Sequence, residues 1–323
     1  MITRRAFCGS TLGVGAALAL TPELLRAAQK SEGKLIERAI PSSGEKLPVI
    51  GLTFGNIAPS TDHAALKEVL KTLVDSGGRV VDTMHDSTGA SELVTATLAN
   101  ELAIQSKVFW AVRGSPPGPP QPEAAAAKAQ LERSFARLKV PKLDLVQVHV
   151  FADPSHLAVM KELKKEGRVR YIGVQVIADN QYEKLESMMR NEPIDFVGVD
   201  YAIDNRGVEE TILPLAEERK IGVLAYLPFG GNSARDGSNT SRLFPRAGTR
   251  PLPEWAADFD AKTWAQFFLK YVISHPAVTV VRTGTSQAKH MLDNIAGGIG
   301  RLPDAATRKR MAELVDAWPA AAR

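Results

Sequence analysis

Residues 143–150, "LDLVQVHV", are followed by "PSHLAVMKELKKEG" (154–167) and then by "VRYIGVQV" (169–176). The first and third segments are nearly continuous apolar runs, as in strands that are buried on both faces of a parallel sheet. The middle segment carries leucine, valine and methionine at helical spacing. Asp153 before Pro154 is typical of a helix start, with a capping residue ahead of proline at the first helical position. Strand, helix and strand in this order predict a βαβ unit.

The same alternation continues along most of the chain. Apolar runs typical of strands occur at 47–55, 79–82, 107–112, 143–150, 169–176, 194–201, 221–229 and 277–283. The stretches between them are helical in pattern; one apolar stripe between Thr61 and Ser76 contains Leu66, Val69, Leu70, Leu73 and Val74. Eight such units in about 250 residues predict an α/β fold, a (β/α)₈ TIM barrel over 35–318. An open doubly wound sheet is the alternative, but the sequence lacks the G-x-G-x-x-G turn that it would need.

Segments outside these units complete the predicted architecture. "IPSSGEKLPVI" (40–50) predicts a small N-terminal β-hairpin that closes the bottom of the barrel, and a C-terminal helix is expected. The proline-rich 114–122 segment and the long 230–255 segment follow strands, so both belong to the top face, where barrel sites lie. Asp179 and Ser286 stand where they would cap the next helices.

The first 28 residues have the layout of an export signal. Arg4 and Arg5 precede Phe7, an apolar run occupies 12–20, and small residues close the segment. A pair of arginines before an apolar residue indicates the twin-arginine route. The apolar run is shorter than the roughly 20 residues that span a membrane. We therefore expect residues 1–28 to engage the twin-arginine export machinery and to direct the protein to the periplasm, with membrane anchoring if the segment is retained.

Composition argues against several other classes of protein. The net charge is +4, and residues 1–28 hold three arginines and one glutamate, so the remainder carries +4 − (3 − 1) = +2. This small charge, without a long basic run, argues against a nucleic-acid partner. The single cysteine, Cys8, falls in the signal segment, which leaves no thiol for a disulfide or a metal. The six histidines lack H-x-H or H-E-x-x-H spacing, so no metal site is expected.

Several motifs together resemble those of the aldo-keto reductases, NADPH-dependent barrel enzymes that reduce aldehydes and ketones. The motifs are "IPSSGEKLPVIGL", "VVDT" with "GASE", "LDLVQVH", "LKKEGRVRYIGV", "AYLPFG" and "GTSQAKHMLDN". The resemblance covers roughly residues 35–311. It implies a TIM barrel, NADP(H) as the cofactor, and a small-molecule carbonyl or alcohol as the substrate.

In this family a tyrosine is the acid, a lysine lowers its pKa, an aspartate pairs with the lysine, and a histidine orients the carbonyl group. The resemblance assigns the aspartate to Asp82 and the histidine to His149. The lysine position holds Arg113. The tyrosine position holds Thr88, or Ser87 when it is counted forward from Asp82. The tyrosine acid of the family is therefore missing from the sequence.

These replacements change the chemistry of the candidate site. A threonine hydroxyl is a far weaker acid than a phenol, whose pKa is near 10. An arginine stays protonated, so Arg113 can donate hydrogen bonds but cannot relay a proton. Asp82 and Arg113 could still form a bidentate ion pair. Histidine titrates near neutral pH, which leaves His149 and His85 as the candidate acids.

The resemblance also implies residues that contact the nicotinamide. The carboxamide positions are Gln175, Val176 and Gly198, of which only Gln175 has a side chain that forms hydrogen bonds. Tyr226 matches the aromatic residue that stacks on the nicotinamide ring. The segment that follows it belongs to the same expected cofactor site and comprises Leu227, Pro228, Phe229 and Gly230.

The phosphate end of the cofactor is expected after the last strand. Free backbone N–H groups and the positive end of a helix favour a phosphate there, at Gly284, Thr285 and Ser286. His290 and Asn294 match family positions that contact the adenosine phosphate and the adenine. Arg282 and Thr283 replace an apolar residue and a proline of the family pattern.

Two functions from different classes follow. The first is an exported NADP(H)-dependent oxidoreductase in which His149 or His85 replaces the tyrosine acid and Arg113 polarises the carbonyl group. The second is a catalytically degenerate barrel that binds a nucleotide or another small molecule, which the missing tyrosine and lysine favour. A hydro-lyase or isomerase that reuses the pocket is a third interpretation. The pattern does not specify the substrate.

Overall fold

The computed structural model describes residues 33–54, 57, 61–83, 89–113, 124–231 and 241–319. The expected signal segment lies outside these residues, so export stays a prediction. His85, Thr88 and the proline-rich 114–122 segment also lie outside them. Within the described residues, no helix has both the length and the apolar character that a membrane span requires.

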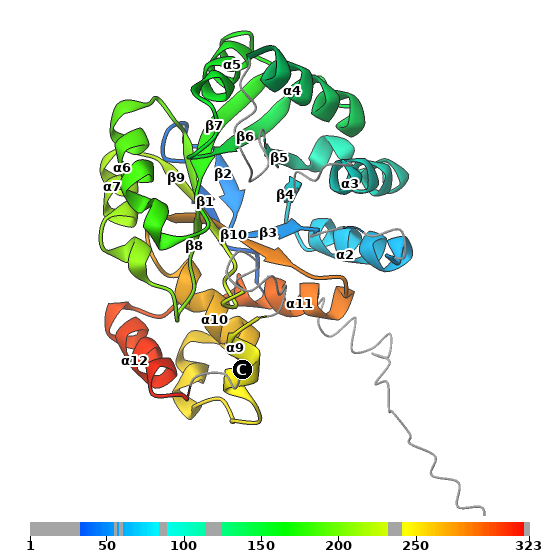
Figure 1. The fold of residues 1–323 in the computed structure, drawn as a ribbon. Coiled ribbons are helices and arrows are strands. Elements are labelled where there is room, and N and C mark those ends of the chain that lie inside the picture. The colour runs from blue at the N-terminus through cyan, green and yellow to red at the C-terminus, as the bar shows by residue number, and fades with distance from the viewer. Residues whose placement is uncertain are drawn as a thin grey trace, which may run out of the picture. The chain divides into compact units, whose positions relative to one another are not determined.

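Eight parallel strands close into a barrel, which confirms the predicted fold (Figure 1). Around the ring the strands are β10 (Val278–Gly284), β3 (Ile50–Thr53), β4 (Val80–Thr83), β5 (Phe109–Arg113), β6 (Leu143–His149), β7 (Val169–Gln175), β8 (Phe196–Asp200) and β9 (Gly222–Tyr226). Every strand pairs in parallel with its neighbours, and the pairing between β10 and β3 closes the ring. Because the strands run in one direction, their carboxyl ends meet at one rim, which we call the mouth of the barrel.

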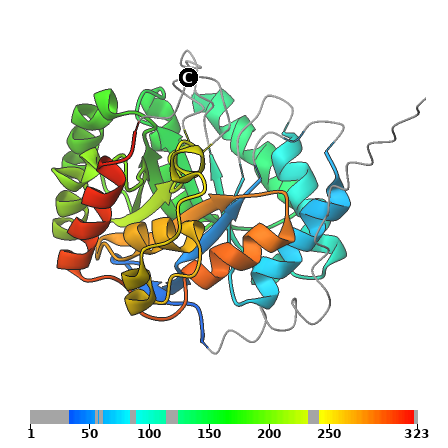
Figure 2. The same cartoon turned by 90° about the horizontal axis from the view of Figure 1, so that it is seen from below.

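Helices cover the outside of the barrel (Figures 1 and 2). They are α2 (His63–Asp75), α3 (Ala90–Glu101), α4 (Ala124–Leu138), α5 (Pro154–Lys165), α6 (Tyr182–Asn191), α7 (Ile212–Glu218), α10 (Trp264–Ile273) and α11 (Ala288–Gly297). Short 3-10 helices are η1 (Gln105–Lys107), η2 (Asp179–Gln181), η3 (Gly207–Glu209) and η4 (Glu254–Phe259). In its described part, the long 230–255 segment contains α9 (Leu243–Ala247) and the start of η4.

The predicted helix starts are correct at one position and wrong at two. The Asp153 carboxylate caps α5, accepting the backbone N–H two residues later at 2.9 Å. In contrast, α6 begins after Gln181, because the 3-10 turn η2 opens at Asp179 and delays the helix. Likewise α11 begins after Gln287, one residue later than Ser286 would require. Caps depend on local backbone angles, which residue type alone does not fix.

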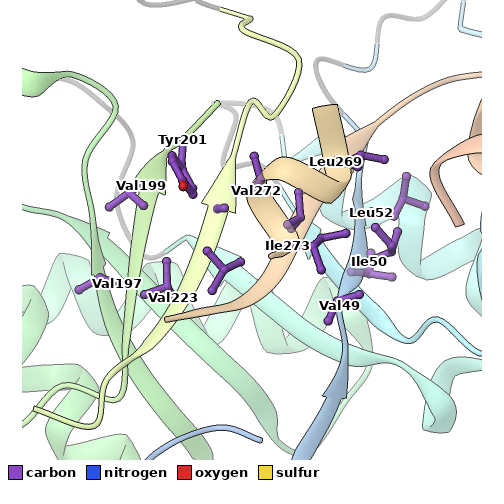
Figure 3. Packing of buried hydrophobic residues seen from close by; sticks show 14 of the residues in the cluster. Val49, Ile50, Leu52, Val197, Val199, Tyr201, Val223, Leu269, Val272 and Ile273 are labelled. Carbon is purple, nitrogen blue, oxygen red and sulfur yellow. The ribbon is translucent and has the colours of Figure 1, made fainter. Parts of the chain in front are cut away.

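An apolar layer lies between the strands and the helices. Figure 3 shows part of it, where Leu269, Val272 and Ile273 of α10 lie on the same side as Ile50 and Leu52 of β3. The predicted C-terminal helix is α12 (Ala305–Asp316), and it packs on α10. Arg308 donates a hydrogen bond to the Ser274 hydroxyl at 2.9 Å, and the ring centroids of Trp264 and Trp318 lie 5.0 Å apart.

The predicted hairpin is also present and consists of β1 (Glu37–Ala39) and β2 (Lys46–Pro48). Ile40 and Leu47 join the apolar cluster inside the barrel, opposite the mouth. Glu45 accepts hydrogen bonds from Arg79 and from the Tyr171 hydroxyl, each at 2.9 Å. The hairpin thus closes the bottom of the barrel with apolar contacts and charge-assisted hydrogen bonds.

The barrel interior changes from apolar to polar toward the mouth. The lower interior positions are apolar, apart from the tyrosine hydroxyl: Val80, Phe109, Leu145, Tyr171, Phe196, Leu224 and Val280. Side chains two residues apart on a strand point to the same face. The positions two residues further along the same strands are Asp82, Ala111, Gln147, Gly173, Gly198, Tyr226 and Arg282. The polar members of this upper layer therefore lie inside the barrel, beneath the mouth.

Gly198 makes room for Tyr226 in this layer. A Cβ atom at Gly198 would lie 2.2 Å from the Tyr226 hydroxyl oxygen. We expect Gly198→Ala to lower the free energy of unfolding by about 1–3 kcal/mol, because the tyrosine ring must move. Gly284→Ala is the matched control, since its added Cβ meets its nearest atom at 3.5 Å. Chemical denaturation measures both variants, and equal stability of the two would contradict this account.

Candidate active site

Unpaired polar atoms gather at the mouth of the barrel. Seven of the nine buried side-chain atoms that lack a partner among the described residues lie there: Asp82 Oδ1, Arg113 Nε, Gln147 Nε2, His149 Nε2, Gln175 Oε1, Asp200 Oδ1 and Arg282 Nε. They come from the carboxyl-terminal halves of β4, β5, β6, β7, β8 and β10. Buried polar groups are normally hydrogen-bonded, so this concentration indicates a site for a polar ligand.

A buried ion cluster forms the centre of this site. Asp82 is fully buried, and its Oδ2 accepts a hydrogen bond from Arg113 Nη2 at 3.3 Å and one from Arg282 Nη1 at 2.5 Å. The predicted pairing of Asp82 with Arg113 is confirmed, but it is not bidentate, because Arg282 binds the same oxygen. Sequence reasoning did not include Arg282 among the site residues. Its signal was a cation inside the apolar run at 277–283.

Tyr226 lies against both arginines. Only 1% of the residue is exposed, and its hydroxyl donates a hydrogen bond to Gln147 Oε1 at 2.9 Å. The guanidinium carbon of Arg282 lies 4.0 Å from the ring centroid, and that of Arg113 lies 5.1 Å from it. These are cation–π contacts in a region removed from water. A stacking partner for Tyr226 would have to displace a neighbouring group, so its stacking role stays a prediction.

Burial shifts the titration of the cluster. It raises the pKa of Asp82 to about 6, while the charge of Arg113 acts in the opposite direction. Arg282 is closer still, so it favours the same charged form of Asp82. Asp82 is therefore the ionised counter-ion of both guanidinium groups at neutral pH. Burial, and then the charge of Asp82, raise the pKa of the Tyr226 hydroxyl above its usual value, so this phenol is a poor acid.

His149, at the end of β6, presents a hydrogen-bond donor at the mouth. Its Nδ1 accepts the backbone N–H of Phe151 at 3.3 Å, which places the proton of the neutral ring on Nε2. Burial lowers the pKa of His149, the Gln181 side chain raises it, and the charge of Arg113 lowers it further. Gln181 lies near the ring, but no hydrogen bond of good geometry reaches Nε2. The ring is thus neutral at neutral pH, and Nε2 is its donor atom.

Gln175 and Asp200 occupy the neighbouring strands. Gln175 stands beside His149 in the pairing of β6 with β7, and its amide oxygen has no partner among the described residues. Burial raises the pKa of the Asp200 carboxyl to about 7; Asn205 and then Arg242 oppose this shift. Asp200 is a titratable group that sequence reasoning did not include, although it is the one acidic residue near the end of the run at 194–201.

The expected phosphate segment lies between β10 and α11. Gly284 and Ser286 are exposed, and the Thr285 hydroxyl lies 3.4 Å from His290 Nδ1. The segment precedes the positive end of α11, which suits an anion. Asn294 is buried, so little of its surface remains for a ligand. The structure thus brings Thr285 and His290 together but leaves Asn294 behind the surface.

The segment after Tyr226 forms a tight turn. The Gly230 N–H donates to the Leu227 carbonyl oxygen at 2.8 Å, and Pro228 is buried. Leu227 itself has a φ of 52°, a left-handed conformation that is uncommon for a leucine. Phe229 is half-buried, and its carbonyl accepts the backbone N–H of Leu243 at 3.2 Å. This turn fixes where the chain leaves β9 beside the mouth.

Removing the carboxylate of Asp82 should destabilise the fold. Asp82→Asn leaves two buried guanidinium groups without their counter-ion, which we expect to lower the free energy of unfolding by about 3–5 kcal/mol. Asp75→Asn is the control, because Asp75 pairs with Lys71 on the surface of α2 and should matter little. Denaturant unfolding of both variants is the measurement. An Asp82→Asn variant as stable as the control would show that the ion cluster does not hold the mouth together.

Asp200 should make stability depend on pH. Its pKa is near 3.8 in the unfolded chain and about 7 in the folded one. Between these values the folded state binds a proton that the unfolded state releases, so stability falls as pH rises from about 4 to about 7. Asp200→Asn should remove this fall, which is on the order of a few kcal/mol. Unfolding free energies at about pH 5 and pH 8 test it, and an unchanged difference in the variant would refute the shift.

Comparisons with known proteins agree with the geometry. The model of the aldo/keto reductase family matches residues 50–309. The uncharacterized oxidoreductase YqkF of Bacillus subtilis is 24% identical over 290 residues, which cover 82% of this chain and 92% of that protein.

Among solved structures, an aldo-keto reductase of Klebsiella pneumoniae in complex with NADPH has a TM-score of 0.67 at 21% identity, over 87% of this chain and 96% of that one. The holo form of AKR11C1 from Bacillus halodurans has a TM-score of 0.65 at 20% identity, with the same coverage of 87% and 96%. These likenesses support the fold, and the family model covers most of the chain. The chain therefore belongs to the aldo/keto reductase family.

Proposed function

We propose that the protein is an NADP(H)-dependent oxidoreductase that transfers hydride to or from a small carbonyl or alcohol substrate. The observation that carries the proposal is the gathering of unpaired buried polar atoms at the mouth of a family barrel. The Klebsiella pneumoniae relative was solved with NADPH, which supports the same cofactor for this chain. The proposal gives the unpaired groups a ligand to bind.

The residues present fit such a cofactor. The exposed Gly284–Ser286 segment and His290 would hold a phosphate at the start of α11. The unpaired amide oxygen of Gln175 would accept a hydrogen bond from a carboxamide. When bound, the cofactor supplies the hydride and the electron pair of the reaction. The chain itself must then orient the substrate, stabilise charge on its oxygen, and provide or remove a proton.

His149 and Arg113 are the groups that we assign to the substrate oxygen. Reduction places negative charge on the carbonyl oxygen, and fixed donors aimed at that charge lower the barrier. The Nε2–H group of His149 has no partner among the described residues, so it is available as such a donor. Arg113 contributes a permanent positive charge, and Asp82 holds its guanidinium in place.

The same histidine is our candidate for the acid in place of the tyrosine. A neutral imidazole donates a hydrogen bond but does not give up its remaining proton readily. Burial is the main cause that lowers the pKa of His149. The charged ring, which could protonate the oxygen, therefore forms at a lower pH than an ordinary histidine would require. His85 lies outside the described residues and stays the second candidate.

A barrel that binds a ligand without turnover is the alternative. It is favoured by the almost complete burial of Tyr226 and by the absence of side-chain donors or acceptors at Val176 and Gly198. Such a protein would bind a nucleotide or another polar molecule at the mouth and leave it unchanged. Turnover separates the two functions, whereas binding alone does not.

We expect the full chain to bind NADPH with a dissociation constant in the micromolar range and to oxidise it with a carbonyl substrate. His149→Gln should leave NADPH binding unchanged and lower kcat/KM by roughly 10²–10⁴-fold, because glutamine can still donate a hydrogen bond but cannot deliver a proton. His63→Gln, at the exposed start of α2, is the matched control. Fluorescence titration measures binding, and cofactor absorbance measures turnover across a panel of aldehydes and ketones.

Each result discriminates between the functions. NADPH binding without turnover of any carbonyl compound would favour the barrel that binds a ligand and leaves it unchanged. Turnover that is equal in His149→Gln and His63→Gln would remove His149 from the reaction and direct attention to His85. A chain that binds no NADPH up to millimolar concentration would end the oxidoreductase proposal.

A further inference from the structure

We propose that Arg113 and Arg282, which we call the arginine pair, form a binding site for a carboxylate group at the mouth of the barrel. The substrate would then be an anionic carbonyl compound, a short oxo acid, and not a neutral aldehyde or ketone. Naming the substrate rests on the proposed function, whereas the anion site rests on the structure alone.

The first argument is the balance of buried charge. The side chains of Arg113 and Arg282 are only 11% and 7% exposed, and both pair with the fully buried Asp82. Among the described residues, no second carboxylate forms an ion pair with either arginine. Two cations thus share one anion in a region from which water is largely excluded. An uncompensated buried charge is strongly unfavourable, and a bound anion would neutralise it.

The second argument is the supply of donors around one ring. Both guanidinium groups lie over the ring of Tyr226, and the Tyr226 hydroxyl binds Gln147. The Nε atoms of both arginines and the Nε2 atom of Gln147 have no partner among the described residues. Because all three side chains contact Tyr226, these unpaired donors belong to one cluster. A carboxylate accepts several such hydrogen bonds through its two oxygens.

The third argument selects the class of anion. One carboxylate carries the single negative charge that the cluster lacks, whereas inorganic phosphate adds up to two charges. A planar carboxylate also matches the fork of a guanidinium group. Phosphate remains an outcome of the test, because it shares the same hydrogen-bonding chemistry.

The position of His149 indicates where the carbonyl group of the substrate would lie. Arg113 stands opposite Gln147 in the pairing of β5 with β6, and His149 follows two residues later. The His149 donor therefore lies one step further along the strand from the arginine pair, so Arg113 can bind the carboxylate while its charge still acts on a carbonyl group few bonds away. Phe151 is 55% exposed, and its ring centroid lies 5.6 Å from that of His149. It offers apolar surface to a short aliphatic chain.

Binding without cofactor tests the site directly. Isothermal titration of the full chain would compare 2-oxobutanoate, propionate, butanone and inorganic phosphate. We expect the two carboxylates to bind saturably and butanone, which lacks the carboxylate, to bind at least about 10-fold more weakly. Arg113→Gln should weaken propionate binding by about 10-fold or more. Arg301→Gln is the control, because Arg301 belongs to an exposed pair with Asp260.

Stability of the ligand-free protein gives a second readout. Arg113→Gln leaves Asp82 paired with Arg282 alone, so the buried charges balance and the variant should unfold at the same or a higher temperature than the wild type. Propionate should raise the unfolding temperature of the wild type but not that of the variant. Should Arg113→Gln fold poorly, Arg113→Lys keeps the charge and loses the planar fork, and we expect it to bind propionate with intermediate affinity.

The outcomes separate the two proposals. Equal propionate binding by the wild type and Arg113→Gln, or equal affinity for butanone and 2-oxobutanoate, would overturn the carboxylate site. So would phosphate binding tighter than propionate with the same loss in Arg113→Gln, which would make the site a phosphate site. NADPH binding and turnover with neutral carbonyls alone would overturn the substrate class and leave the reductase intact. Carboxylate binding without NADPH binding would support the anion site and end the reductase proposal.

Discussion

The mouth of this barrel depends on the Asp82 carboxylate, which is fully buried between two guanidinium groups. A buried charge must be paired, and here one oxygen serves both Arg113 and Arg282. The two cations in turn lie over Tyr226, whose hydroxyl holds Gln147. One carboxylate thereby fixes side chains from β4, β5, β6, β9 and β10 relative to one another.

Space for the cluster comes from small residues and from the closed bottom of the barrel. Gly198 lets Tyr226 lie across the interior, since any side chain there would meet the ring. Below, the hairpin and the large apolar side chains of the strands fill the barrel. Among the described residues, the unpaired buried polar atoms of the barrel interior therefore gather at the upper end, where a ligand can reach them. Unpaired buried groups cost stability, which is typical of sites that complete their hydrogen bonds on binding.

Under the proposed function, Arg113 at the position of the family's lysine would supply fixed charge in place of a proton relay. A lysine can change its protonation when it is buried, whereas an arginine keeps its charge and its planar set of donors. Under the proposed function, the site would therefore stabilise an anionic oxygen strongly and deliver a proton less readily. Among the described residues at the mouth, burial raises the pKa of Asp82 to about 6 and that of Asp200 to about 7, whereas it lowers the pKa of His149. In the proposed reaction, proton supply rather than charge stabilisation is the step that would differ most from the family pattern.

Local sequence patterns were sufficient to predict the barrel and to identify part of the candidate site. Apolar runs and helical stripes depend on periods of two and 3.6 residues, which are visible in the chain itself, and they predicted the eight units and the hairpin. Motifs placed Asp82, Arg113 and His149 at strand ends. The role of Arg282 required the closed structure, because it lies 200 residues from Asp82 and meets it only when β10 pairs with β3. The sequence also did not predict the burial of Tyr226 or the raised pKa of Asp200, because both arise from packing between distant segments. It did not predict the late starts of α6 and α11, because they depend on backbone angles that residue type does not fix.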